Sequence, residues 1–309
     1  MSRVRVPEEL ELAVATHVGR VRTSNQDDYL ILMPSSAAGT PRGRAGCLLA
    51  IADGMGGVAG GAQASRAALR ALGAVAAGDL LADGEELLVR GFAAADERVH
   101  ERAAETVGLS DMGTTMTALF LQGAAAAVAH IGDTRCLRIR GGQVEQLTLD
   151  HAMHESRNLL TKVIGGGQRG GDPDLASFEL RAGDIFVLLT DGVWGEVTSD
   201  ELAQDLRPGG LQAGCERLLG RVFERGAPDN ATVLAVRVGA VPVAHSRSRE
   251  VELPAGEARI GVAGAFGPAG LVRWPRWPYA LIATSVVLLL LAWLRTRHGF
   301  DLFDVLGLR

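Results

Sequence analysis

Cysteine is scarce in this chain of 309 residues, which contains only Cys47, Cys136 and Cys215. Their number is odd and no two have a CxxC spacing, so a disulfide framework or a zinc site is not expected and a reducing compartment fits. The N-terminus lacks a continuous apolar stretch, so we expect no signal peptide. Basic residues are not in excess either, because the formal net charge is −5. Nucleic acid is therefore not an expected partner.

One long apolar run lies close to the C-terminus. Tyr279–Leu294 consists of sixteen uncharged, mostly apolar residues, and Trp277 and Pro278 extend it. A bilayer core requires about 20 such residues, and tryptophans at both ends resemble an interfacial belt. This pattern predicts a single transmembrane helix over 277–294 and a short tail over 295–309, the alternative being a buried or interfacial helix. Arginines flank the run on both sides, so positive charge does not set its orientation.

Residues 9–239 have the pattern of one α+β domain. Short apolar runs recur along it, and Gly141-Gly142 between two of them predicts a hairpin. The expected strands are Glu11–His17, Tyr29–Met33, Cys47–Ala52, Thr115–Leu121, Ala125–Ile131, Arg135–Arg140, Val144–Leu147, Ser177–Leu180, Ile185–Thr190 and Ala231–Val238.

Four helices are expected in the same range. Two are long and alanine-rich with apolar residues at helical spacing, and a third opens with the capping-box pattern Thr198-Ser199-Asp200-Glu201. Because strands come in runs with helices before and after them, we expect packed antiparallel sheets with helices outside. Residues 240–276 are rich in charge, glycine and proline, which predicts a linker. The expected helices are Ala62–Ala76, Glu85–Ala104, Thr198 to about Leu206, and about Leu211 to Arg225.

Four aspartates stand beside apolar strands in a similar way. Asp53, Asp133 and Asp191 each come at or just after the end of a strand, and Asp229 stands just before one. An Asp-Gly or Asp-Asn pair alone is usually only a turn former. Several carboxylates brought to strand ends from distant segments instead indicate a shared site for a hard metal ion.

These aspartates belong to motifs whose order resembles the metal-dependent protein phosphatases of type 2C, in their bacterial form. The resemblance spans about residues 10–238. It implies a four-layer α-β-β-α sandwich of two antiparallel sheets, with two metal ions in a cleft at one edge of the sheets. The motifs are GRVRTSNQDD at 19–28, ADGMGG at 52–57, GTT at 113–115, HIGDTR at 130–135, DH at 150–151, LTKVIG at 160–165, TDG at 190–192 and PDNAT at 228–232.

The resemblance also implies a set of metal ligands. Asp53 resembles the carboxylate that bridges both ions, and the Gly54 carbonyl resembles a ligand of one of them. Asp191 and Asp229 resemble ligands of the other ion, and Asp133 resembles the aspartate of a weaker third site. Oxygen ligands of this kind suit Mg²⁺ or Mn²⁺ and not zinc.

Two further residues have implied roles. Asp27 resembles an outer carboxylate that holds metal-bound waters, and Arg22 resembles the arginine that grips the substrate phosphate. The planar guanidinium of an arginine matches two phosphate oxygens, which a lysine cannot copy. A water or hydroxide between the two cations would attack phosphorus in line, so no phosphoenzyme is needed.

The sequence departs from the family pattern at three places. Gln26 stands where many relatives have glutamate, so the second cation would be bound more weakly. Met55 stands where animal relatives have a histidine, and neither His17 nor His151 is assigned that acid role. Only about nine residues separate Asp150 from Leu160, so the flap that borders the cleft is short. We therefore expect an incomplete third site and a more open cleft.

The expected protein is a membrane-tethered serine/threonine phosphoprotein phosphatase that faces the cytoplasm and opposes Ser/Thr kinases. Its single-pass anchor would be the C-terminal helix, and phosphoprotein substrates and free thiols place the catalytic domain inside the cell. The alternative is a phosphoprotein-binding scaffold that kept the fold and lost catalysis, for which Gln26 and the short flap speak. A phosphatase acting on an aspartyl- or serine-phosphorylated regulator of a stress response remains a third possibility.

Overall fold

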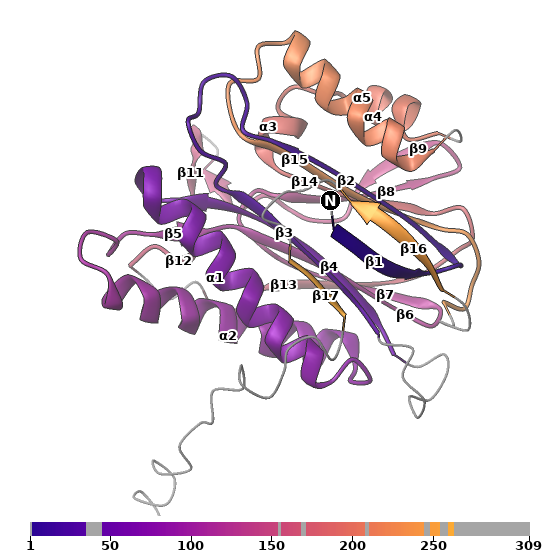
Figure 1. Ribbon diagram of the computed structural model, residues 1–309, viewed down its shortest axis with the longest axis horizontal. Helices are drawn as coiled ribbons and strands as arrows, with labels where there is room; N and C mark the ends of the chain where they lie inside the picture. Colours follow the sequence, from indigo (N-terminus) through magenta and orange to yellow (C-terminus); the bar gives the residue numbers. More distant parts are fainter. Residues whose placement is uncertain are drawn as a thin grey trace, which may run out of the picture. The chain divides into compact units, whose positions relative to one another are not determined.

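The computed structural model describes residues 2–34, 45–153, 156–167, 171–207, 210–243, 248–253 and 259–262. Two large sheets lie face to face in this part of the chain, and helices cover their outer faces (Figure 1). The four-layer α-β-β-α arrangement that the motifs implied is therefore confirmed for the described residues.

The first sheet contains eight strands in the order β12-β5-β4-β6-β7-β13, with β3 paired to β4 and β17 paired to β3. All of these pairs are antiparallel except β17 with β3. Its strands are β3 (Asp27–Met33), β4 (Cys47–Met55), β5 (Gly113–Thr114), β6 (Met116–Gln122), β7 (Ala125–Ile131), β12 (Ile164–Gly165), β13 (Asp174–Glu179) and β17 (Arg259–Val262).

The second sheet is antiparallel throughout, in the order β2-β15-β14-β8-β9. Gly141 and Gly142 connect β8 to β9 with positive φ at both positions, as the hairpin signal predicted. Its strands are β2 (Leu10–His17), β8 (Arg135–Arg140), β9 (Gln143–Gln146), β14 (Ile185–Leu189) and β15 (Ala231–Val238). Two small sheets pair β1 (Ser2–Pro7) with β16 (Ser248–Leu253), and β10 (Ala152–Met153) with β11 (Ser156–Leu160).

Both faces of the central strands are buried, which explains their continuous apolar runs. In β4, Leu48 and Ala50 pack toward the helices on the outer face, whereas Leu49 and Ile51 pack toward the second sheet. The long helices α1 (Gly57–Gly78) and α2 (Gly84–Glu105) cover the first sheet, and Leu72 and Phe92 belong to that outer core.

The second sheet is covered by α4 (Ser199–Asp205) and α5 (Leu211–Glu224), and the short helix α3 (Asp191–Trp194) follows β14. The capping box predicted at the start of α4 is present, because Thr198 accepts from the Glu201 amide and the Glu201 side chain accepts from the Thr198 amide. This pair satisfies two amides at the helix N-terminus.

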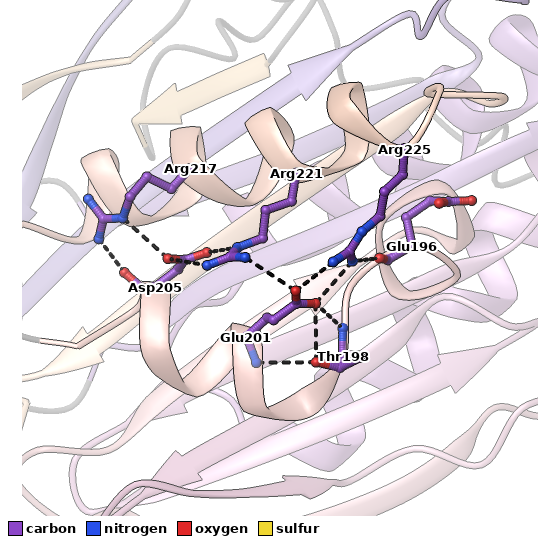
Figure 2. A network of polar contacts seen from close by, with 7 residues as sticks. All are labelled: Glu196, Thr198, Glu201, Asp205, Arg217, Arg221 and Arg225. Atoms are coloured by element: carbon purple, nitrogen blue, oxygen red, sulfur yellow. Dashed lines mark hydrogen bonds and ion pairs between the residues drawn. The ribbon is translucent and has the colours of Figure 1, made fainter.

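Charged side chains join α4 to α5. Figure 2 shows three arginines on successive turns of α5 reaching toward two acids on α4. The Arg221 Nε donates to Asp205 at 2.6 Å, and Arg225 pairs with Glu201. The Arg225 partnership and the capping bonds lower the pKa of Glu201 to about 2. Because Asp205 is buried, the network fixes how the helix pair lies on the second sheet.

Two strands lie in the range for which the sequence predicted a linker. β16 pairs with β1 along its full length, and β17 pairs in parallel with the edge strand β3. Val243 and Val251 from this range join Val4 and Val6 in the core between the sheets. The linker prediction is therefore wrong for these described residues, and β1 extends the domain before residue 9, where we placed its start.

Shortening the chain should reveal what this extension contributes. A chain ending at Ala240 should have a free energy of unfolding about 3 kcal/mol lower than a chain ending at Val262, because Val243 and Val251 are removed and Val4 and Val6 lose their cover. Urea denaturation of both chains measures the difference. Equal stability would mean that the pairing of β16 and β17 contributes nothing in solution.

The predicted transmembrane segment 277–294 and the tail 295–309 lie outside the described residues. Among the residues that are described, no helix is long and apolar enough to cross a bilayer.

Candidate active site

A cavity of about 750 Å³ opens at one edge of the paired sheets. It gathers loops and strand ends from four distant parts of the chain, which is where ligands commonly bind. Every residue predicted as a metal ligand lines it, together with Arg22; Asp27 is not among the lining residues and is fully buried behind them. The predicted residues in the lining are Arg22, Asp53, Gly54, Asp133, Asp191 and Asp229.

Asp53 and Asp27 face each other across two paired strands. They are direct partners in the antiparallel β3–β4 register, so their side chains share one face of the sheet. The sequence placed Asp53 just after its strand, but β4 continues to Met55 because Gly54 and Met55 pair with β5. Burial, followed by the charges of Asp27 and Asp191, raises the pKa of Asp53 well above its usual value.

Asp27 is held from below by two threonine hydroxyls. Thr190 and Thr232 donate to its Oδ2 at 2.9 and 2.7 Å, while Oδ1 is buried without a hydrogen-bond partner among the described residues. Burial raises the pKa of Asp27 to about 7, against the opposing effect of those two hydrogen bonds. The free Oδ1 is thus an acceptor available to a donor or cation beside Asp53.

Asp191 and Asp229 come from the ends of the central strands of the second sheet. Asp191 follows β14 at the start of α3, and Asp229 precedes β15. Arg22 donates from Nη2 to Asp229 Oδ2 at 2.7 Å. Burial, and then the charge of Asp229, raises the pKa of Asp191, whose Oδ1 is buried without a partner among the described residues.

Asp133 lies in the loop between β7 and β8 and is 7% exposed. Burial and the neighbouring charge of Asp191 raise its pKa to about 7. The indole of Trp194 donates to the Asp133 carbonyl at 3.0 Å, and the Arg135 guanidinium lies 3.6 Å from the centre of the Trp194 ring. Trp194 is therefore a packing residue that supports the Asp133 loop, as the sequence suggested.

The loop that carries Arg22 is fastened by Asn230, a buried residue to which the sequence assigned no role. Its Oδ1 accepts from the Gln26 amide at 2.8 Å, and its Nδ2 donates to the carbonyls of Val18 and Ser24. Asn230 follows Asp229 directly, so one turn positions both a carboxylate and the arginine loop. The PDNAT motif was the available signal, but its partners are more than 200 residues away.

Gln26 makes a contact that a glutamate could not make. Its Nε2 donates to the Gly57 carbonyl at 2.6 Å, at the start of α1. A carboxylate there would place oxygen against oxygen, so the glutamine holds the ADGMGG loop onto β3 by donating. In this structure Gln26 therefore supports the wall of the cavity through its amide nitrogen.

The fit of these residues to divalent cations can be judged from their own chemistry. In the described part of the chain, no three His, Cys, Asp or Glu side chains already stand close enough to form a complete metal cluster. The cavity nevertheless concentrates carboxylates whose pKa values are raised by burial and by one another, and two of them have an unpartnered oxygen. Hard cations that keep several waters need only a few such ligands. The residues present fit that group.

His130 lies behind the Asp133 loop and its ring is buried. Its Nδ1 and the Thr117 hydroxyl are 2.9 Å apart, and its ring stacks on that of His151 with centroids 5.0 Å apart. Burial, and then His151, lowers the pKa of His130 to about 4. Neither His17 nor His151 lines the cavity, which agrees with leaving them out of the acid role.

Acidification should therefore destabilise the domain through His130. The unfolded histidine binds a proton below about pH 6.5 but the folded one does so only below about pH 4, so its contribution to stability is complete above pH 6.5 and is lost as the pH falls to 4. Between wild type and His130→Gln, the difference in free energy of unfolding should change by roughly 3 kcal/mol across this window. Urea unfolding at pH 7, 5.5 and 4 measures it, and a parallel pH dependence in both proteins would contradict the prediction.

Comparison with known proteins identifies the family. A model of the protein phosphatase 2C family matches residues 18–233. The chain belongs to this family. The expected resemblance is thereby confirmed, and the protein phosphatase 2C region contains all the predicted site residues.

Named relatives of this protein phosphatase 2C chain are bacterial. The chain is 31% identical to the serine/threonine protein phosphatase PstP of Mycobacterium tuberculosis, over 76% of this chain and 46% of that protein. It is 28% identical to the protein phosphatase PhpP of Streptococcus pneumoniae, over 74% of this chain and 97% of that one. The chain thus spans about half the length of PstP.

Solved structures of the family have the same fold. The catalytic domain of PstP in complex with two manganese ions superposes with a TM-score of 0.64 at 28% identity, covering 75% of this chain and 99% of that domain. A serine/threonine phosphatase of S. agalactiae gives a TM-score of 0.66 at 26% identity, with 74% and 99% covered.

Proposed function

We propose that this chain hydrolyses phosphoserine and phosphothreonine in proteins with the help of two divalent cations, Mn²⁺ or Mg²⁺. The observation that carries the proposal is a single cavity in which Arg22 stands among the carboxylates of Asp53, Asp191 and Asp229. The serine/threonine phosphatase names of PstP and PhpP, and the two manganese ions in the PstP structure, support it.

The buried carboxylates are assigned to the cations. Asp53 is placed between the other ligands and would be shared by both ions, with the Gly54 carbonyl on one side. Asp191 and Asp229 would hold the second ion, and Asp133 would contribute to a weaker third site. The unpartnered Asp191 Oδ1 is the atom best prepared for this role.

The cations, when bound, supply a water of lowered pKa as nucleophile and neutralise the phosphate. Arg22 is half-exposed and can turn its guanidinium from Asp229 toward two phosphate oxygens. Asp27 is fixed by Thr190 and Thr232, so its free Oδ1 can accept a proton-bearing group beside Asp53. Met55 lines the cavity where a histidine acid would stand, and no histidine of the described residues does, so a water must protonate the leaving group.

A direct assay tests this function. The purified chain should hydrolyse phosphothreonine and phosphoserine peptides with added manganese and lose that activity in EDTA. A phosphotyrosine peptide of the same sequence should be a poor substrate. No turnover with either manganese or magnesium would contradict the proposal. Phosphopeptide binding without cations would then favour the scaffold alternative.

Membrane tethering and opposition to Ser/Thr kinases complete the proposal. The apolar run 277–294 supports an anchor, and the three buried free cysteines are compatible with a domain on the cytoplasmic side. Phosphoproteins made by Ser/Thr kinases are the substrates that the proposed reaction consumes. Full-length protein should sediment with membranes, whereas a chain ending at Val262 should remain in the supernatant.

A further inference from the structure

Exposed apolar side chains gather on one short stretch beside the cavity. Of the seven large hydrophobic residues exposed in the described part of the chain, three lie between residues 149 and 160. Leu149 is 76% exposed, Met153 51% and Leu159 56%. Such a local concentration of exposed apolar surface marks an interaction site more often than scattered single residues do.

This stretch also forms part of the cavity. Leu159 and Leu160, at the end of β11, line it together with Val163 in the following turn. These three residues form an apolar wall, whereas the rest of the lining carries five aspartates and Arg22. The cavity is thus divided by chemistry into a polar part that suits a phosphate and an apolar part that does not.

The base of the β10–β11 hairpin is fixed to the domain. The His151 amide donates to the Gly132 carbonyl at 2.7 Å, and the Gly132 amide donates to His151 Nδ1 at 3.0 Å. His151 Nε2 and Lys162 both contact Asp174 at 3.1 Å, and the Thr161 amide donates to the His151 carbonyl. The apolar wall is therefore held in place next to the Asp133 loop.

The occupant of the wall follows from the size of the cavity. A phosphate is only a few times the size of a water molecule, which takes roughly 30 Å³ in the liquid. Most of the 750 Å³ is left for the chain that carries the phosphate. Neighbouring residues of an extended peptide lie roughly 3.3 Å apart along the strand. A side chain next to the phosphorylated residue therefore reaches the wall, and the aspartates disfavour an acidic one.

We propose that the apolar wall of Leu159, Leu160 and Val163 selects phosphoprotein substrates with an apolar side chain directly beside the phosphorylated serine or threonine. This inference rests on the proposed function and names the substrate class of the same cavity. Leu159 is its specificity-determining residue, because it is more than half exposed and so loses water only when a substrate covers it.

Two matched peptides and two variants test it. Both phosphothreonine peptides have the same sequence, except that the residues flanking phosphothreonine are leucine in one and asparagine, of similar size, in the other. Wild type should have a kcat/KM roughly tenfold higher for the leucine peptide, and Leu159→Asn should reduce this preference to within about twofold. Leu81→Asn makes the same change at a leucine that is 48% exposed and outside the cavity lining, and should keep the preference.

Two further measurements separate this proposal from the phosphatase proposal. Hydrolysis of p-nitrophenyl phosphate, which has no flanking residues, should be equal in wild type and Leu159→Asn. Fluorescence anisotropy of the same peptides should show tighter binding of the leucine peptide to wild type alone, even if no peptide is hydrolysed. Loss of all hydrolysis would overturn the phosphatase function only. Equal treatment of both peptides by wild type in hydrolysis and binding, or an unchanged preference in Leu159→Asn, would overturn the wall.

Discussion

Replacing Asp53 by asparagine should abolish manganese-dependent phosphatase activity while making the metal-free protein more stable. Asparagine keeps the shape of the side chain but removes the charge that would be shared between two cations. Because changes to groups that only support metal ligands already reduce activity roughly 10- to 100-fold, loss of a bridging ligand should exceed 100-fold.

The gain in stability has a separate cause. An unfolded Asp53 is ionised at pH 7, so folding without metal must either bury that charge among like charges or take up a proton, and both are unfavourable. Asparagine avoids this penalty. A gain of about 2 kcal/mol corresponds to a rise in Tm of roughly 4–8 °C for a domain of this size.

Calorimetry and an activity assay on the same preparation check both effects. Asp200→Asn is the matched control, because Asp200 is exposed in the first turn of α4, far from the cavity lining in sequence and not part of it. Activity within tenfold of wild type would remove Asp53 from the centre of the site. Retained loss of activity with an unchanged Tm would show that the buried charges are relieved in some other way.

Replacing Arg22 by methionine should weaken the substrate and strengthen the metal. The guanidinium is the phosphate-gripping group of the proposed site, and a charged hydrogen bond of this kind contributes roughly 10- to 100-fold to substrate binding. The same guanidinium is 2.7 Å from Asp229 Oδ2, where it competes with a cation for that carboxylate. Since the pair is partly exposed, its removal should tighten Mn²⁺ binding only about two- to fivefold.

The two effects have opposite signs, so they distinguish the roles of Arg22. Phosphopeptide kinetics at saturating manganese give KM, and calorimetric titration of manganese gives the metal affinity without substrate. Arg20→Met is the control in the same loop, because Arg20 packs over the Phe223 ring instead of lining the cavity. An unchanged KM in Arg22→Met would mean that Arg22 serves only to neutralise Asp229.

Much of the fold could be predicted because its core strands carry a strong local signal. All ten predicted strands and all four predicted helices are present, since long apolar runs and alanine-rich periodic segments have few alternatives once both faces must be buried. The elements that were missed are short or marginal. β5 and β12 contain two residues each, and β16 and β17 are recognised only through their partners β1 and β3.

Part of the candidate site was equally accessible. The aspartates at positions 27, 53, 133, 191 and 229 stand in short motifs whose chemistry is local, and they converge in the structure. Their partners are not local. That Asn230 fastens the Arg22 loop, and that Gln26 donates to Gly57, depends on backbone groups which sequence does not mark.

The sequence by itself determined the residue types of this site, because burying several carboxylates without a basic partner of equal number has few explanations other than a cation. Only the tertiary structure decided which of them is paired. It placed Arg22 on Asp229, left one oxygen each of Asp27 and Asp191 without a partner among the described residues, and set an apolar wall opposite them. Contacts of this kind join segments more than 100 residues apart, and hydrogen-bond geometry and desolvation select them only after the chain has folded.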